Sequence, residues 1–292
     1  MVNLRSLSLL TLLSLPATLH AQELGELDVI GAPVERGINF QPAVTSLARD
    51  IHWLDNMLLV IITAIVLFVV ALLAYVVMRF RAEANDTPAR FTHNSTVEIT
   101  WTVVPVLILI VIGSFSLPVL FKQLEVPEAD LTIKTTGYQW YWSYEYPEEG
   151  IMFDAYMLGL NEPEMNDAVR DELAEYGYDE TAWKLATDQA MVVPVNKIVR
   201  LQVTAGDVIH AWKIPAFGVH MDGIPGRLNE TWFMAEQEGI YFGQCSELCG
   251  INHSYMPITV KVVSEEAYAN WVVSQGGTVA GTVRETTVAS AE

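Results

Sequence analysis

Two long apolar stretches, each without a charged residue, dominate the hydrophobic pattern of the first half of the chain. They cover residues 56–78 and 99–121, and each contains 23 residues. About 20 apolar residues suffice to cross the hydrocarbon core of a bilayer as an α-helix. The pattern therefore predicts two membrane-spanning helices over these ranges. Pro105 and Pro118 fall inside the second, where a lipid-embedded helix tolerates a kink.

A shorter apolar stretch, LSLLTLLSLPATLHA, follows Arg5 near the N-terminus. A basic residue, a short apolar run and a small residue at Ala21 are typical of a secretory signal peptide, here residues 1–21. An uncleaved signal anchor is the alternative, because Leu19 stands where a smaller residue is preferred. The signal sends the mature N-terminus outward, so the two spans form a hairpin with the outer N-terminal segment, 22–55, and the C-terminal part outside. The loop between the spans agrees with the positive-inside rule, since it carries Arg79, Arg81 and Arg90.

Beyond residue 126 the pattern becomes short and β-like. The segments LTIKTTGYQWYWSYEY, VVPVNKIVRLQVTA, YFGQC and MPITVKVV are rich in β-branched and aromatic residues, with turn residues between them. IVRLQVTA alternates apolar and polar positions, as a half-buried strand does. Several such strands predict an all-β sandwich or Greek-key barrel over residues 122–275.

Three segments of this outer region depart from the β pattern. Residues 160–189 are acidic and rich in helix formers, which predicts a partly helical insert. SEEAYANWVV predicts a short C-terminal helix with Ser264 as its N-cap. Residues 276–292 are small and polar, which predicts a flexible tail.

Charge is distributed very unevenly along the chain. The formal net charge is −19, and residues 123–292 hold 26 acidic and 9 basic residues, a net charge of −17. An acidic outer domain repels nucleic acid and anionic lipid head groups, and it attracts basic proteins by long-range steering. Nucleic acid is therefore not an expected partner. Composition alone favours the alternative, a merely solvated acidic surface.

Both cysteines of the chain lie in CSELCGINHSYM, residues 245–256, where His253 and Met256 follow Cys245 and Cys249. A disulfide is allowed outside the membrane, but it would close a very small loop and leave the other two ligands unexplained. A structural zinc site rarely uses a thioether. Thiolate, imidazole and thioether together favour copper.

The number of cysteines bears on the kind of copper site. A mononuclear blue-copper site needs one cysteine, two histidines and a weak methionine ligand, so this chain has one cysteine too many. Two thiolates can instead bridge two copper ions, each with one histidine and one weak ligand, and the carbonyl of Glu247 lies between the cysteines. The second histidine must come from elsewhere. His210, at a predicted strand end in DVIHAW, is favoured, and His220 is the alternative.

Several of these segments together resemble one known family. DVIHAW, PGRLN, YFGQCSELCGINHSYMPI, GYQWYWSYEY and the two-span hairpin resemble cytochrome c oxidase subunit II over nearly the whole mature chain. The resemblance implies a cupredoxin-like outer domain that holds a dinuclear copper centre, CuA. It also implies magnesium (or manganese) at the boundary with subunit I, held in part by the Glu247 side chain. The implied copper ligands are His210, Cys245, Cys249, His253, Met256 and the carbonyl of Glu247.

The resemblance also assigns roles to two residues outside the ligand loop. Trp140 is then the exposed ring at which the electron enters from cytochrome c, whereas core packing is the alternative for this aromatic strand. Glu98, at the inner start of the second span, is then at the mouth of a proton channel of subunit I. An ordinary interfacial acid is the alternative for Glu98. Tyr138 stands where the family often has histidine, and the position is not a ligand.

Acids near the copper loop and the aromatic strand are the predicted docking residues for a basic cytochrome c. Glu145 lies in the Trp140 strand, Asp154 follows it closely, and Asp207 lies three residues before His210. The alternative is that they are ordinary surface charges, each contributing well under ~1 kcal/mol.

We therefore expect the electron-accepting subunit of a proton-pumping respiratory oxidase. It takes electrons from cytochrome c at CuA and passes them to haem in subunit I, where oxygen is reduced. The expected partners are subunit I, subunit III, cytochrome c and membrane lipid, and the expected location is the bacterial inner membrane with the copper domain on the periplasmic side. A copper-free subunit II of a quinol oxidase would lack the cysteines. A membrane-tethered copper carrier would not need the two spans, the acidic face and the Trp140 strand together.

Overall fold

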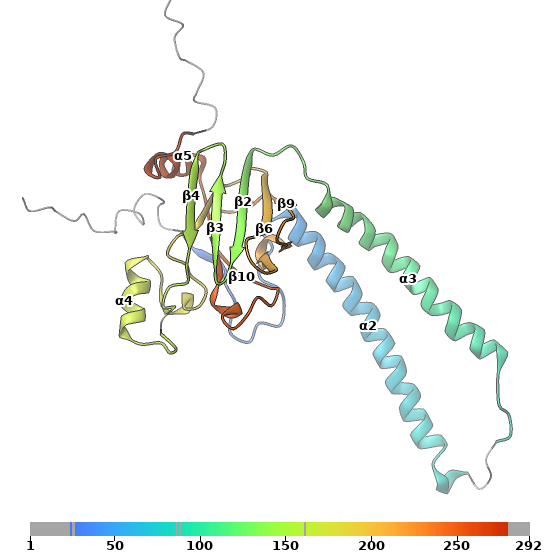
Figure 1. The fold of residues 1–292 in the computed structure, drawn as a ribbon. Coiled ribbons are helices and arrows are strands. Elements are labelled where there is room, and N and C mark those ends of the chain that lie inside the picture. Colours follow the sequence, from blue (N-terminus) through green and yellow to red (C-terminus); the bar gives the residue numbers. More distant parts are fainter. Residues whose placement is uncertain (1–23, 25–26, 86, 88, 161, 280–292) are drawn as a thin grey trace, which may run out of the picture.

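The computed structural model describes residues 24, 27–85, 87, 89–160 and 162–279, and the predicted signal peptide lies outside this part of the chain. A hairpin of two long helices projects from a β-domain (Figure 1). Helix α2 spans Ser46–Arg79 and helix α3 spans Ser95–Leu124, joined by a loop that contains the short helix η1, Ala82–Ala84. Both long helices are long and apolar enough to cross a membrane.

Both helices are longer than the predicted spans, 56–78 and 99–121. With 34 residues, α2 is about 50 Å long at 1.5 Å per residue. A bilayer core is about 30 Å thick, so the helix ends extend beyond it. Residues 46–55 of the predicted outer segment consequently belong to α2. Helix α3 continues through Pro105 and Pro118.

Side-chain caps fix where the two helices begin. The hydroxyl oxygen of Thr45 accepts a hydrogen bond from the backbone N–H of Ala48 at 3.0 Å. Asn94 caps α3 in the same way, accepting from the N–H of Val97 at 3.2 Å. Each cap satisfies an amide that has no partner inside the helix.

The β-domain is a sandwich of two sheets, which confirms the predicted fold class. One sheet has the order β4-β3-β2-β6-β9, the other has the order β1-β10-β11-β5, and β7 pairs with β8 in a separate ribbon. The strands are β1 (Val29–Gly31), β2 (Leu131–Tyr138), β3 (Tyr141–Tyr146), β4 (Ile151–Ala155), β5 (Met191–Pro194), β6 (Val199–Ala205), β7 (His210–Ile214), β8 (Val219–Gly223), β9 (Asn229–Phe233), β10 (Gly239–Gln244) and β11 (Pro257–Val263).

The registers of these strands position the chain around the ligand loop. Strand β6 alternates buried and half-buried residues, as its sequence predicts, and pairs in parallel with β2. Strands β2 and β3 form a hairpin in which Tyr138 faces Tyr141, so Gln139 and Trp140 form its turn. Strand β1 pairs in parallel with β10, an addition that the sequence pattern did not predict.

Aromatic side chains dominate the core between the sheets. Large aromatic rings bury about 150–250 Å² each and account for much of the stability of such a core. The core continues to the ligand loop, because it also contains Cys245, Cys249 and Met256. The largest fully buried rings are Trp142, Trp212, Tyr144, Tyr146, Tyr241, Phe217, Phe233 and Phe242.

The acidic insert, 160–189, is partly helical, as predicted. It contains helix α4, Asp167–Glu175, and the short helix η2, Glu180–Ala182. Its buried residues form a second cluster with two residues of β10, Ile240 and Phe242. The insert is therefore packed against the sheet that leads into the ligand loop.

The C-terminal helix α5 spans Glu265–Ser274, and Ser264 caps it by accepting from the N–H of Ala267 at 3.2 Å. The first residues of the expected tail, 276–292, are bonded to the domain. The N–H of Gly277 donates to the carbonyl of Val272, and the N–H of Thr278 donates to the carbonyl of Glu149. Residues 280–292 lie outside the described chain.

Polar contacts attach the β-domain to the helical hairpin. The guanidinium of Arg49 donates two hydrogen bonds of 2.8 Å to the carboxylate of Glu236. Lys122 forms an ion pair with Asp50 at 2.6 Å, and the indole N–H of Trp232 donates to the Lys122 carbonyl at 3.1 Å. These bonds fix the domain against the outer ends of α2 and α3.

Candidate metal centre

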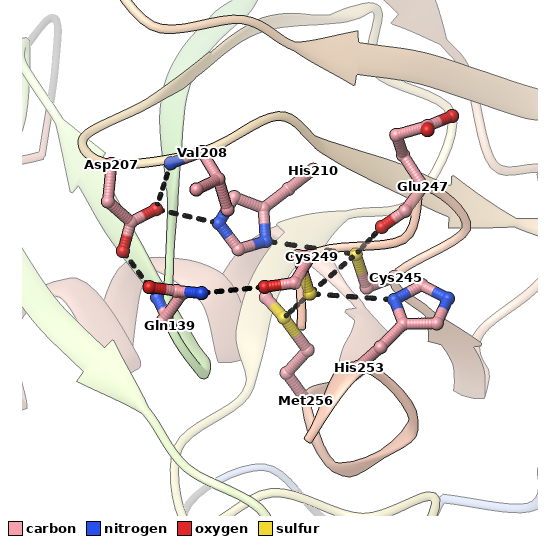
Figure 2. A network of polar contacts seen from close by, with 9 residues as sticks. All are labelled: Gln139, Asp207, Val208, His210, Cys245, Glu247, Cys249, His253 and Met256. Carbon is pink, nitrogen blue, oxygen red and sulfur yellow. Dashed lines mark hydrogen bonds and ion pairs between the residues drawn. The ribbon is translucent and has the colours of Figure 1, made fainter. Parts of the chain in front are cut away.

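The loop between β10 and β11 carries most of the predicted ligands. Cys245 directly follows β10, His253 begins the short helix η4, His253–Tyr255, and Met256 directly precedes β11. Because β10 and β11 are antiparallel neighbours, both ends of the loop are fixed on one sheet. His210, the first residue of β7, approaches from a separate strand pair (Figure 2).

Sulfur, nitrogen and oxygen donors converge at the end of the sandwich. The two cysteine sulfurs are 3.9 Å apart, and both are buried free thiols. Cys245 Sγ lies 3.8 Å from Nδ1 of His210 and 3.3 Å from the carbonyl oxygen of Glu247. Cys249 Sγ lies 3.5 Å from Nδ1 of His253 and 3.5 Å from Sδ of Met256. The cysteines are thus not joined in a disulfide, and each sulfur has its own imidazole neighbour.

The structure brings His210, and not His220, to the cysteines. His210 is fully buried, and one of its ring nitrogens lies within 4.8 Å of both sulfurs. A side chain at Gly137 of β2 would come within 2.8 Å of the His210 ring, so glycine leaves the room that this ring occupies. His220 lies on β8 with its side chain 53% exposed, and its Nε2 lies 3.0 Å from the hydroxyl of Ser246.

Asp207 orients the imidazole of His210. Its Oδ1 lies 2.9 Å from Nε2 of His210 and accepts from the N–H of Val208, while its Oδ2 accepts from the N–H of Gln139 at 2.7 Å. Partial burial acts to raise the pKa of the Asp207 carboxyl, but these bonds outweigh it, and the pKa is lowered. The predicted docking acid is therefore already engaged inside the domain. Its bond to Nε2 leaves Nδ1 of His210 directed at Cys245.

Burial also affects the pKa of the Cys249 thiol. It raises the pKa of Cys249 to about 12, with a further contribution from the adjacent Cys245. The thiol is thus protonated at neutral pH without metal. Because metal ligands bind as thiolates, metal binding at this site releases protons.

Gln139 is a contact residue that the sequence reasoning missed. Its side-chain N–H donates to the carbonyl of Cys249 at 2.7 Å, across 110 residues of sequence. The backbone N–H of Gln139 donates to the carboxylate of Asp207. The only sequence signal was its position beside Trp140 in GYQWYW, and that signal gives no partner.

Trp140 is half-buried rather than fully exposed, and it packs at the edge of the core. Trp142 and Tyr144 are buried, which confirms the core-packing interpretation for these two rings. Tyr141 is half-buried and stacks between Tyr138 and Tyr156, with ring centroids 5.1 and 4.7 Å away. Trp140 is thus less buried than Trp142 and Tyr144, the core rings of the adjacent strand β3.

The remaining predicted residues lie outside the cluster. The carboxylate of Glu247 is exposed and points away from the sulfurs, while its carbonyl faces Cys245 (Figure 2). Glu145 forms an ion pair with Lys134 at 2.9 Å, and Asp154 is exposed on β4. Glu98 lies in the first turn of α3, where Oε1 accepts from the N–H of Asn94 at 3.3 Å. A local helix-capping role therefore exists for Glu98.

Comparison with known proteins gives consistent matches along the chain. The family model described as cytochrome c oxidase subunit II, periplasmic domain, matches residues 131–263, and the corresponding transmembrane-domain model matches residues 33–119. The chain is 58% identical to cytochrome c oxidase subunit 2 of Cereibacter sphaeroides over 269 residues, covering 90% of this chain and 89% of that protein. It is 44% identical to the probable cytochrome c oxidase subunit 2 of Rickettsia felis, covering 84% of this chain and 74% of that protein.

Among solved structures, one similar chain is the periplasmic domain of subunit II of cytochrome oxidase of Bradyrhizobium japonicum. It is 49% identical, and the match covers 52% of this chain and 97% of that chain with a TM-score of 0.44.

Proposed function

Because this chain belongs to the cytochrome c oxidase subunit II family, we propose that the donor cluster around Cys245 and Cys249 is its CuA centre. The chain is the membrane-anchored, electron-accepting subunit of a haem–copper oxidase, an oxidoreductase complex with further subunits. The observation that carries the proposal is the convergence of His210 with both cysteines, all three buried, from two separate parts of the β-domain. It supports a metal centre built by the fold rather than by the loop alone.

The donor set fits a dinuclear copper centre. It offers two thiols, two imidazoles, a thioether and a backbone carbonyl, whose nearest donor pairs are separated by 3.3–3.9 Å. Soft sulfur and imidazole donors favour copper over magnesium or calcium. The proposed ligands are His210, Cys245, Cys249, His253, Met256 and the carbonyl of Glu247.

When bound, copper would supply a one-electron acceptor at this site, and the thiolates of Cys245 and Cys249 would be the groups that hold it. The protein contributes rigidity. The loop is fixed at both ends on β10 and β11, and its inner donors belong to the hydrophobic core. Asp207 holds His210 in one orientation, as partners of ligating histidines generally do. Burial of the cluster excludes solvent from the thiols.

Trp140 is proposed as the ring at which the electron enters from cytochrome c. Its half-buried position at the domain edge, beside the ligand loop, supports this role. Cytochrome c is proposed to dock on the acidic outer domain, where Asp154 supplies exposed charge. Glu145 is half-buried, and Lys134 compensates part of its charge. Asp207 contributes less, because its carboxylate is engaged with His210.

The positions of the hairpin and the acids support a proposed arrangement in the complex. The β-domain is on the periplasmic side of a bacterial inner membrane, in contact with subunit I and subunit III. The exposed Glu247 side chain, on the outside of the ligand loop, is free to share a magnesium or manganese ion with subunit I. Glu98 belongs to the first turn of α3, and this end of α3 lies away from the β-domain (Figure 1). On the inner side of the membrane it fits a proton-channel mouth despite its capping bond.

Replacement of Trp140 by alanine in the complete oxidase tests the proposed route. The variant should retain its copper and its copper spectrum, because Trp140 supplies none of the proposed ligands. Electron transfer from reduced cytochrome c should fall at every salt concentration, as followed by rapid-mixing absorbance. A normal transfer rate would reduce Trp140 to a packing residue and require another point at which electrons enter.

A further inference from the structure

Gln139 joins the Trp140 turn to both ligand-bearing segments of the centre. Its side-chain N–H donates to the carbonyl of Cys249, and its backbone N–H donates to the carboxylate of Asp207, each at 2.7 Å. Asp207 in turn contacts His210 (Figure 2). One residue thus bonds to the ligand loop on one side and to the partner of the buried histidine on the other.

The same turn packs directly on the ligand loop. A Cβ added at Gly250 would lie 3.0 Å from Cζ2 of Trp140 and 3.1 Å from Nε2 of Gln139. Gly250 also has φ +129°, a conformation that residues with side chains rarely adopt. The loop backbone directly after Cys249 therefore packs closely against both residues of the turn.

Trp140 has no hydrogen bond of its own to fix its ring. Its indole nitrogen is buried, and no acceptor for it lies among the described residues. A buried tryptophan N–H usually has a partner. The position of the ring therefore depends on its neighbours, and Gln139 is the neighbour that is itself bonded to the loop.

We propose that Gln139 is a positioning residue for electron transfer into the centre. Its amide fastens the β2–β3 turn to Cys249, so that the Trp140 ring stays against Gly250 and next to a ligand. The inference rests on the proposed function of this site. Electron transfer falls steeply with each non-bonded gap along its path, so a turn that drifts from the loop slows transfer without changing the ligands.

Gln139 is exposed, so a direct contact with cytochrome c is the competing role for this residue. The two roles differ in what they change. A docking residue alters the concentration of cytochrome c needed for half-maximal rate. A positioning residue alters the rate within the bound complex, because its amide is committed to Cys249 rather than to a partner.

The test is Gln139→Met in the complete oxidase, which keeps side-chain length and removes the donor. We expect two copper ions per chain, an unchanged copper midpoint potential and an unchanged KM for cytochrome c. The transfer rate at saturating cytochrome c should fall by about 10- to 100-fold, since a misplacement of about 1 Å can cost a positioned group about a hundredfold in rate. Gln139→Glu should lower the saturated rate equally, because a carboxylate cannot donate to the carbonyl.

Gln244→Met is the matched control. The Gln244 amide also donates to a backbone carbonyl, that of Lys184 at 3.3 Å, but this carbonyl belongs to the acidic insert and not to the ligand loop. This variant should match the wild type in every measurement. A wild-type saturated rate in Gln139→Met would overturn the proposal, as would opposite changes of KM in the Met and Glu variants. A wild-type oxidase that lacks two copper ions per chain would instead contradict the proposed function.

Discussion

Gly243 lies where the strand that leads into Cys245 crosses the strand that carries His210. It is in β10, two residues before Cys245, and β7 packs against it. A methyl group added at Gly243 would overlap the carbonyl oxygen of Lys213 and lie 2.7 Å from Cδ1 of Ile214. We predict that Gly243→Ala forces β7 away from β10 and separates His210 from the sulfur of Cys245.

The size of the effect follows from the atoms involved. Overpacking typically costs about 1–3 kcal/mol, and the overlapped atom here belongs to the backbone and cannot rotate away. The free energy of unfolding should therefore decrease by about 3 kcal/mol, near the upper end of this range. For a protein of 150–250 residues, each kcal/mol shifts Tm by about 2–4 °C, so we expect Tm to fall by about 6–12 °C.

Thermal unfolding and copper analysis of the purified chain measure both consequences. Gly243→Ala should unfold at lower temperature and bind less copper. Gly226→Ala is the control, because a Cβ there meets nothing within 4 Å and only the positive φ of +77° is unfavourable. That strain costs about 1–2 kcal/mol and should leave copper binding intact. Wild-type stability and full copper content in Gly243→Ala would refute the idea that this crossing positions the two ligand segments.

Three further predictions concern carboxylates. Burial raises the pKa of Glu149 above its ordinary 4.5, so the folded chain holds a proton that the unfolded chain releases, and stability should fall as pH rises from about 4.5 towards the raised pKa. Glu149→Gln should remove this slope in thermal unfolding, and an undiminished slope would contradict it. Glu247→Gln in the complex should alter the signal of bound manganese and leave the copper spectrum intact, whereas the reverse result would disprove the assignment. Joint neutralisation of Glu145 and Asp154 should slow cytochrome c oxidation at low salt only, because salt screens steering. Asp207 is kept in this variant because its carboxylate orients His210. An unchanged low-salt rate would move docking to other acids, such as those of 160–189.

Local patterns were sufficient to predict much of this protein. The two apolar runs, the alternation in β6 and the Ser264 cap are each encoded within a few neighbouring residues, and each has the predicted structure. Five of the six proposed donors lie in one loop, so their grouping could also be inferred from spacing. His210 was expected at a strand end, and the structure places it at the start of β7, beside Cys245.

Contacts between distant segments could not be predicted in this way. The hydrogen bond from Gln139 to Cys249 joins residues 110 positions apart. In the sequence, nothing distinguishes Gln139 from an ordinary surface glutamine. Strand β1 has three residues and gains its conformation from β10. Asp207 looked like a surface acid because nothing in the sequence reveals that its carboxylate turns toward His210.

The central claim is that two buried thiols and two imidazoles form one dinuclear copper centre. Copper analysis combined with paramagnetic resonance of the purified chain tests it most directly. We predict two copper ions per chain and a spectrum in which one unpaired electron is shared by both copper nuclei, lost in Cys249→Ser and in His210→Asn but retained in His220→Asn. One copper ion per chain with a blue-copper spectrum, or loss of the centre in His220→Asn alone, would contradict the account.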